Sequence, residues 1–87
     1  MLMVPTDQGP REIALRDSRQ ASLVGKYWSA VHRYLATGNS YQLEKFAGKH
    51  VVTAEGHRVA LLTDVRDLDR LGSAGVLSFE SLYGRTA

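Results

Sequence analysis

Cysteine is absent from this chain of 87 residues, and its absence excludes several classes of protein at once. Without thiols the chain cannot form a disulfide framework, a thiolate zinc site, an iron–sulfur cluster or a cysteine nucleophile. Only two prolines occur, and no apolar run is long enough to span a bilayer. Because the first ten residues lack the basic segment of a signal peptide, we expect a cytoplasmic protein that does not bind membranes.

The length predicts one small domain with a modest core. A domain of this size buries about 60–65% of the surface that its unfolded chain exposes, so burial against a partner is a plausible supplement to its stability. We therefore expect a homodimer or a complex with a larger protein. The net charge is +2, and the excess of Lys and Arg lies in residues 11–58.

Apolar spacing predicts an α+β fold that begins with a long amphipathic helix. Residues 1–10 are interpreted as a flexible lead-in, because Pro10 suits the first position of a helix. Apolar residues then recur at helical spacing over residues 11–36, most clearly from Val24 onward. Gly38 is expected to end this helix, since glycine readily adopts the left-handed conformation that closes helices.

A short second helix and a β-hairpin follow in the prediction. Asn39 can cap the helix, which Gly48 ends. Residues 50–54 and 57–62 are rich in β-branched side chains and are separated by Glu55-Gly56, which predicts a hairpin. A two-residue turn at this place would put Val52 opposite Val59.

The prediction ends with a C-terminal helix and a final helical turn. Thr63 or Asp64 can cap the helix, and Ser78 can cap the last turn. The single α+β domain then covers residues 11–84, and residues 85–87 form a tail. The apolar residues of these two elements are Val65, Leu68, Leu71, Phe79, Leu82 and Tyr83.

Basic residues form a stripe along the first helix. Arg19, Lys26 and Arg33 are seven residues apart, so they lie almost one above another at steps of about 10.5 Å. Such a stripe suits a phosphate backbone or an acidic protein surface, although it also suits the ordinary solvated face of an amphipathic helix. Three further cations extend the patch if the fold brings them round: Lys45, Lys49 and Arg58.

Aromatic residues on the same helix are candidates for a partner interface. These are Tyr27, Trp28 and Tyr34. Tyrosine and tryptophan combine a large contact area with one polar group, and both are enriched in interface cores. The alternative is that they form the core of the domain itself.

No set of residues predicts catalysis, a metal site or a cofactor. His50 and His57, with Lys49 and Arg58, would have to converge to act as a small ribonuclease, and nothing in their spacing requires this. We expect these histidines to be exposed strand residues and the protein not to be an enzyme. His32 is expected to be structural.

A resemblance covers most of the chain. Its residues are Tyr27-Trp28, Val31, Tyr34-Leu35, Thr37-Gly38, Leu43, Phe46, Gly48-Lys49, Val51, Leu62-Thr63-Asp64, Leu68, Leu71, Gly75, Leu77, Phe79 and Leu82-Tyr83. In this arrangement the chain resembles uncharacterised short proteins of actinobacteria and their phages. The resemblance implies a shared small fold and carries no activity, ligand or site.

Two functions follow from the sequence. The first is a small non-enzymatic interaction or regulatory module that acts through its long aromatic-rich helix. The second is a basic nucleic-acid-binding accessory protein that contacts phosphates through the cations named above.

Overall fold

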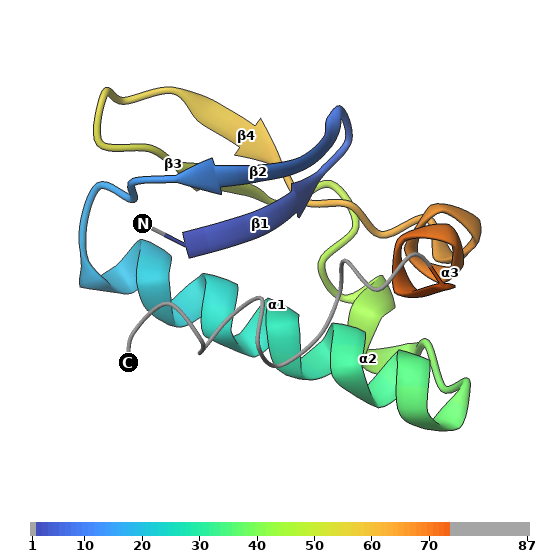
Figure 1. The fold of residues 1–87 in the computed structure, drawn as a ribbon. Coiled ribbons are helices and arrows are strands. Elements are labelled where there is room, and N and C mark those ends of the chain that lie inside the picture. Colours follow the sequence, from blue (N-terminus) through green and yellow to red (C-terminus); the bar gives the residue numbers. More distant parts are fainter. Residues whose placement is uncertain (1, 74–87) are drawn as a thin grey trace, which may run out of the picture.

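Two β-hairpins and three helices make up residues 2–73, the part of the chain that the computed structural model describes (Figure 1). The elements are β1 (Leu2–Thr6), β2 (Gly9–Ile13), α1 (Ser18–Thr37), α2 (Tyr41–Glu44), β3 (His50–Val52), β4 (Arg58–Ala60) and α3 (Val65–Ser73). The α+β class is therefore confirmed. The predicted final turn at Ser78 and the tail at residues 85–87 lie outside the described residues.

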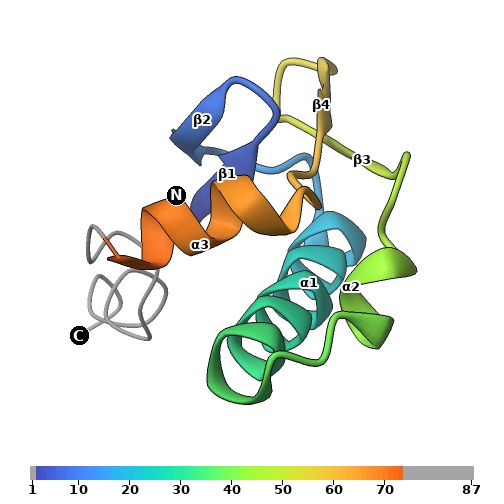
Figure 2. The same ribbon diagram turned by 90° about the vertical axis from the view of Figure 1, so that its right-hand side faces the viewer.

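The two hairpins are joined at both ends and cover one side of α1. Isolated bridges pair Thr6 with Leu61 and Leu15 with Thr53, so single residue pairs link the two sheets at two places. Figure 1 shows both hairpins on the same side of α1, and Figure 2 shows α2 and α3 on either side of this helix. Within residues 2–73, α1 is therefore the element against which the hairpins and the other helices pack.

Residues 2–10 are not a flexible lead-in. Leu2–Thr6 forms a strand, in which Val4 is fully buried, and it pairs with Gly9–Ile13. Pro10, interpreted above as the start of a helix, instead faces Pro5 in the ladder. Neither proline has an N–H, so this pair is a position where the antiparallel ladder requires no donor from either residue.

Helix α1 therefore begins at Ser18, seven residues later than predicted. Asp17 is its N-cap, because the Asp17 Oδ1 accepts hydrogen bonds from the backbone N–H groups of Arg19 and Gln20 at 3.1 and 3.2 Å. The two bonds lower the pKa of the Asp17 carboxyl group, and the bond from Gln20 has the larger effect. The helix closes at Gly38, whose φ of 77° places it in the left-handed region and whose N–H donates to the Tyr34 carbonyl.

The second hairpin differs from the prediction by one residue. Val51 pairs with Val59, and Val52 pairs with Arg58, so the prediction that Val52 faces Val59 is wrong. The reason is the turn: the Thr53 N–H donates to the His57 carbonyl at 2.8 Å, which leaves three residues in the loop instead of two. The last of the three is Gly56, with a φ of 86°, as three-residue hairpin loops require.

The core gathers on α1 between the hairpins and the other helices. Tyr27 and Trp28 are fully buried and each bonds a strand or the segment after it. The Tyr27 hydroxyl donates to the Leu62 carbonyl at 2.6 Å, and the Trp28 Nε1–H donates to the Met3 carbonyl at 2.9 Å. Burial of each such ring contributes on the order of 2–3 kcal/mol, so these two side chains are principal ties between α1 and the rest.

Candidate basic groove

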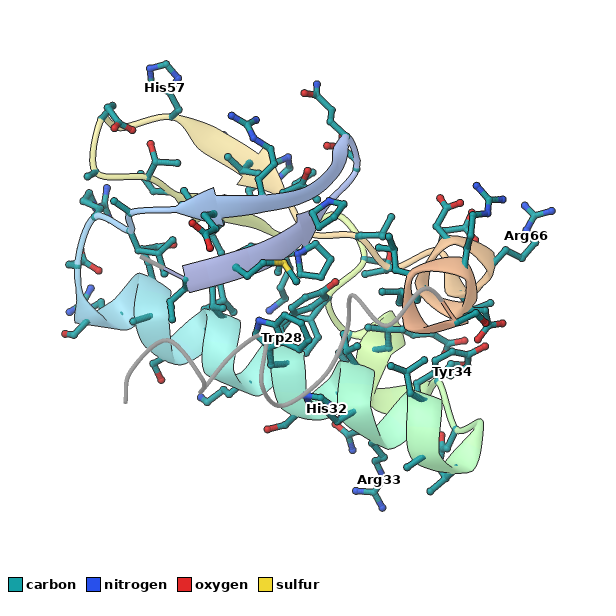
Figure 3. The ribbon with its side chains drawn as sticks, viewed as in Figure 1. Trp28, His32, Arg33, Tyr34, His57 and Arg66 are labelled. Carbon is teal, nitrogen blue, oxygen red and sulfur yellow. The ribbon has the colours of Figure 1, made fainter. Side chains whose placement is uncertain are left out.

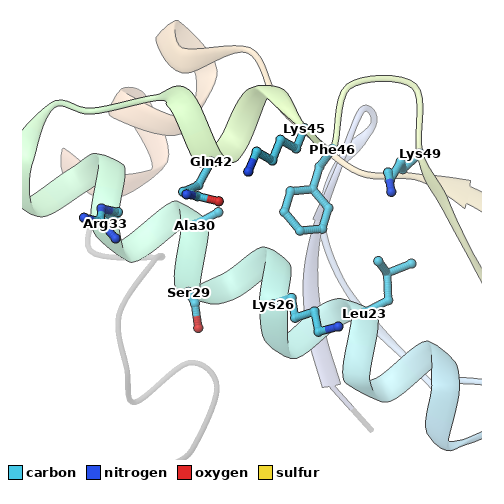
Figure 4. Close-up of a pocket in the computed structure, with 9 residues that line it drawn as sticks. All are labelled: Leu23, Lys26, Ser29, Ala30, Arg33, Gln42, Lys45, Phe46 and Lys49. Atoms are coloured by element: carbon cyan, nitrogen blue, oxygen red, sulfur yellow. The ribbon is translucent and has the colours of Figure 1, made fainter.

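A groove of about 520 Å³ runs between α1 and the segment that contains α2 (Figure 4). We call it the basic groove, because four of its lining residues are cations. Its lining residues are Leu23, Lys26, Ser29, Ala30, Arg33, Gln42, Lys45, Phe46 and Lys49. Four of the six cations proposed from the sequence are therefore brought to one place.

Helix α1 supplies one wall of the basic groove. Lys26 and Arg33 are two turns apart on the same face, so both side chains border the groove. Between them lie Ser29 and Ala30, and Ala30 is small enough to let the opposite segment approach. The shared position of Lys26 and Arg33 on this wall is the one that their seven-residue spacing predicts.

The opposite wall comes from α2 and the turns after it. Lys45 and Lys49 follow α2, and Gly48, with a φ of 78°, turns the chain toward β3. Phe46 anchors this segment to the core, since its ring packs edge-on against Tyr27 with the ring centroids 5.7 Å apart. The Lys49 Nζ lies 5.9 Å from the centroid of the Phe46 ring. Phe46 thus forms part of an apolar floor of the groove, and Lys49 lies beside it.

The charge of the basic groove is not neutralised by its own walls. No carboxylate is among its lining residues, and Glu44 of α2 is exposed without lining it. Within residues 2–73, the ion pairs closer than 4 Å involve Arg16, Arg66 and Arg70, and none of the four groove cations. A groove with this charge and an apolar floor attracts an anion that also has apolar surface.

Arg19 and Arg58 lie outside the basic groove. Arg19 is exposed in the first turn of α1, and Arg58 lines a separate hollow of about 190 Å³ with Arg11 and His50. The sequence could not separate Arg58 from the groove residues, because the position of its side chain depends on which face of the hairpin points outward. Of the six cations in the predicted patch, four therefore line the basic groove.

Two of the three residues predicted for a partner interface lie in the core of this chain. Tyr27 and Trp28 are 0% exposed within this single chain, so neither can touch a partner without opening the core. Tyr34 is partly buried, and its hydroxyl donates to the Asp69 Oδ2 at 3.1 Å, which ties α1 to α3. The pKa of the Tyr34 hydroxyl is raised, first by burial and then by the nearby Asp69 carboxylate. The aromatic face of α1 is thus core, the alternative stated above.

The two hairpin histidines do not converge. His57 is paired with Thr53, three positions along the strand from His50, which separates their backbones by about 10 Å. The hollow that His50 lines does not include His57 (Figure 3 shows His57 at the loop end of the hairpin). Among the described residues no group of three or more His, Cys, Asp or Glu side chains is placed to hold a metal ion.

His32 packs on the indole of Trp28 (Figure 3). The burial of this imidazole predicts that the stability of the protein depends on pH. The two rings are stacked with centroids 5.4 Å apart, and burial lowers the pKa of His32 below its usual 6.5. In the unfolded chain His32 therefore takes up a proton at higher pH than in the folded protein. We expect the free energy of unfolding to fall as the pH drops below about 6.5, until the lower folded-state pKa is reached.

Urea unfolding at about pH 7.5 and about pH 5.5 measures this effect. His32→Phe keeps an aromatic ring on Trp28 and removes the titrating group, so its midpoint should change less between the two pH values than that of the parent protein. An unchanged pH dependence in this variant would assign the effect to other groups.

Tyr41 is a candidate functional residue that is not among those predicted from the sequence. Its side chain is 63% exposed, and the Lys45 Nζ lies 4.9 Å from the centroid of its ring. The signal was available in the spacing, because Tyr41 and Lys45 are four residues apart and therefore neighbours on a helix. Gln42, which lines the basic groove, is not among the residues predicted from the sequence either.

Comparison with family models, curated proteins and solved structures finds no match to this chain. The resemblance to short actinobacterial and phage proteins therefore stays a prediction. None of the helices in residues 2–73 combines the length and apolar character that a membrane crossing requires.

Proposed function

We propose that this chain is a nucleic-acid-binding accessory protein that contacts phosphates through the basic groove. The observation that supports the proposal is the gathering of Lys26, Arg33, Lys45 and Lys49 around one groove without a lining carboxylate. Cations placed around a groove can neutralise consecutive phosphates and release their counterions, which provides most of the affinity of such contacts. Binding of this kind reads little sequence and depends steeply on salt.

The salt dependence of affinity tests this proposal. Four phosphate contacts give a slope of log K against log salt of about −2.8 for a single strand and about −3.6 for B-DNA. Between about 50 and 200 mM salt, affinity should therefore fall about 50- to 150-fold. Fluorescence anisotropy with labelled mixed-sequence single strands and duplexes provides the measurement, and no binding at about 50 mM salt would contradict the proposal.

A second function is a non-enzymatic interaction module, with an acidic protein as the occupant of the basic groove. The observation that favours it is the apolar floor of Leu23, Ala30 and Phe46, which would accept an apolar side chain of an acidic segment. Self-association belongs to this second proposal, and it would have to use a surface other than Tyr27 and Trp28. Both functions suit a cytoplasmic protein, and neither uses a catalytic residue, a metal or a cofactor.

A further inference from the structure

An exposed aromatic ring stands beside the basic groove. Tyr41 is the first residue of α2, and among the described residues it is the exposed large hydrophobic side chain. Its backbone is fixed, because the Tyr41 N–H donates to the Asn39 Oδ1 at 2.9 Å. The Lys45 ammonium lies 4.9 Å from the ring centroid, and Lys45 also lines the groove. A cation of the groove and an open ring are therefore adjacent.

This pairing of groups matches the chemistry of a nucleotide. A phosphate neutralised by Lys45 would bring the base attached to it within reach of the Tyr41 ring. Every base has a π-face, so stacking on an aromatic side chain tolerates any sequence, as does contact with phosphates. Duplex DNA offers no such base, because its bases are already stacked within the helix. The ring is thus useful only to a ligand whose bases are open.

The arrangement of the cations favours the same ligand. Lys26 and Arg33 border the groove on one wall and Lys45 and Lys49 on the other, and no carboxylate lines it. Positively charged grooves flanked by an aromatic side chain are typical of proteins that bind single strands, because the cations follow the backbone while the ring stacks on a base. The cations and the neighbouring open ring therefore favour one strand over two.

We propose that the occupant of the basic groove is single-stranded nucleic acid and that Tyr41 stacks on one of its bases. This inference rests on the proposed function and narrows its ligand. It assigns different roles to two neighbouring residues: Lys45 contributes to the salt dependence, whereas Tyr41 contributes affinity that salt does not change.

The test compares the full chain with Tyr41→Ala and Tyr41→Trp by fluorescence anisotropy. The probes are a labelled mixed-sequence single strand of about 12 nucleotides and the duplex of the same sequence. Tyr41→Ala should weaken single-strand binding about 5- to 150-fold, the equivalent of about 1–3 kcal/mol for one stacked base. The salt slope should stay the same, duplex binding should not change, and Tyr41→Trp should restore single-strand affinity.

Lys45→Ala is the comparison on the neighbouring residue. It should lower the magnitude of the salt slope by about 0.7 for a single strand. Since Tyr41 and Lys45 are both exposed, both variants should keep the far-UV circular dichroism of the parent protein.

Two failures are distinguishable. Salt-dependent binding with an unchanged Tyr41→Ala affinity, or with duplex bound as tightly as single strand, would overturn the inference and leave the proposed function standing. Absence of binding to either probe at about 50 mM salt would overturn both.

Discussion

Trp28→Ala should lower the free energy of unfolding by about 3–5 kcal/mol, as the loss of a fully buried tryptophan does in other cores. The side chain is fully buried, and its Nε1–H donates to the Met3 carbonyl at 2.9 Å. The substitution therefore leaves a cavity beneath β1 and an unsatisfied carbonyl. For a domain of 87 residues the whole stability is about 4–13 kcal/mol, so the expected loss is a large share of the total.

Urea unfolding followed by circular dichroism measures the effect, because Trp28 is the sole tryptophan and fluorescence is lost with it. Trp28→Phe retains most of the ring and loses the hydrogen bond, so a smaller loss is expected. Tyr41→Ala removes an exposed ring and should change stability by no more than about 0.5 kcal/mol. Equal stability of Trp28→Ala and Tyr41→Ala would show that the indole is not part of the core.

The same burial explains where sequence analysis succeeded on α1 and where it failed. Helical spacing from Val24 onward predicted a helix through Trp28 that ends at Gly38, and α1 does both. Spacing alone does not say what covers the apolar face of the helix. The covering elements include β1, whose short sequence with Pro5 has no helical or alternating pattern that stands out. The sequence therefore leaves open whether another molecule or the domain itself covers the aromatic face.

The N-terminal hairpin could have been suspected from the start of α1. Asp17 followed three residues later by Gln20 is the pattern of a helix cap. A cap at Asp17 places the start of the helix at Ser18, and it leaves residues 2–13 for another element. Pro10 suited a helix start as well, and only the pairing with Pro5, a contact within the fold, decides between the two.

Two of the four cations of the basic groove could be placed together from the sequence. Lys26 and Arg33 share a face of α1 through their spacing alone, because a helix fixes the relation of residues seven apart. Lys45 and Lys49 reach the same place through the packing of α2 on α1 and the turn at Gly48. No local pattern encodes that packing, so the sequence could offer these residues only as a possible extension.

Removing two cations from the basic groove should weaken nucleic-acid binding far more than removing two from elsewhere. Lys26→Ala with Lys45→Ala takes one cation from each wall. At about 1–1.5 kcal/mol for each solvent-exposed phosphate contact, the loss of two should cost about 2–3 kcal/mol, which is roughly a 30- to 150-fold loss of affinity at low salt. The salt slope for a single strand should fall in magnitude by about 1.4.

Arg66→Ala with Arg70→Ala is the matched control, because it also removes two positive charges. Both side chains are at least 80% exposed on α3, and Figure 3 shows Arg66 pointing away from α1. Charges this far from the ligand act only through the screened field of the whole protein, which decays over about 10 Å at 0.1 M salt. The control should therefore keep its salt slope and lose little affinity. Equal losses in the two double variants would mean that net charge, and not the basic groove, drives binding.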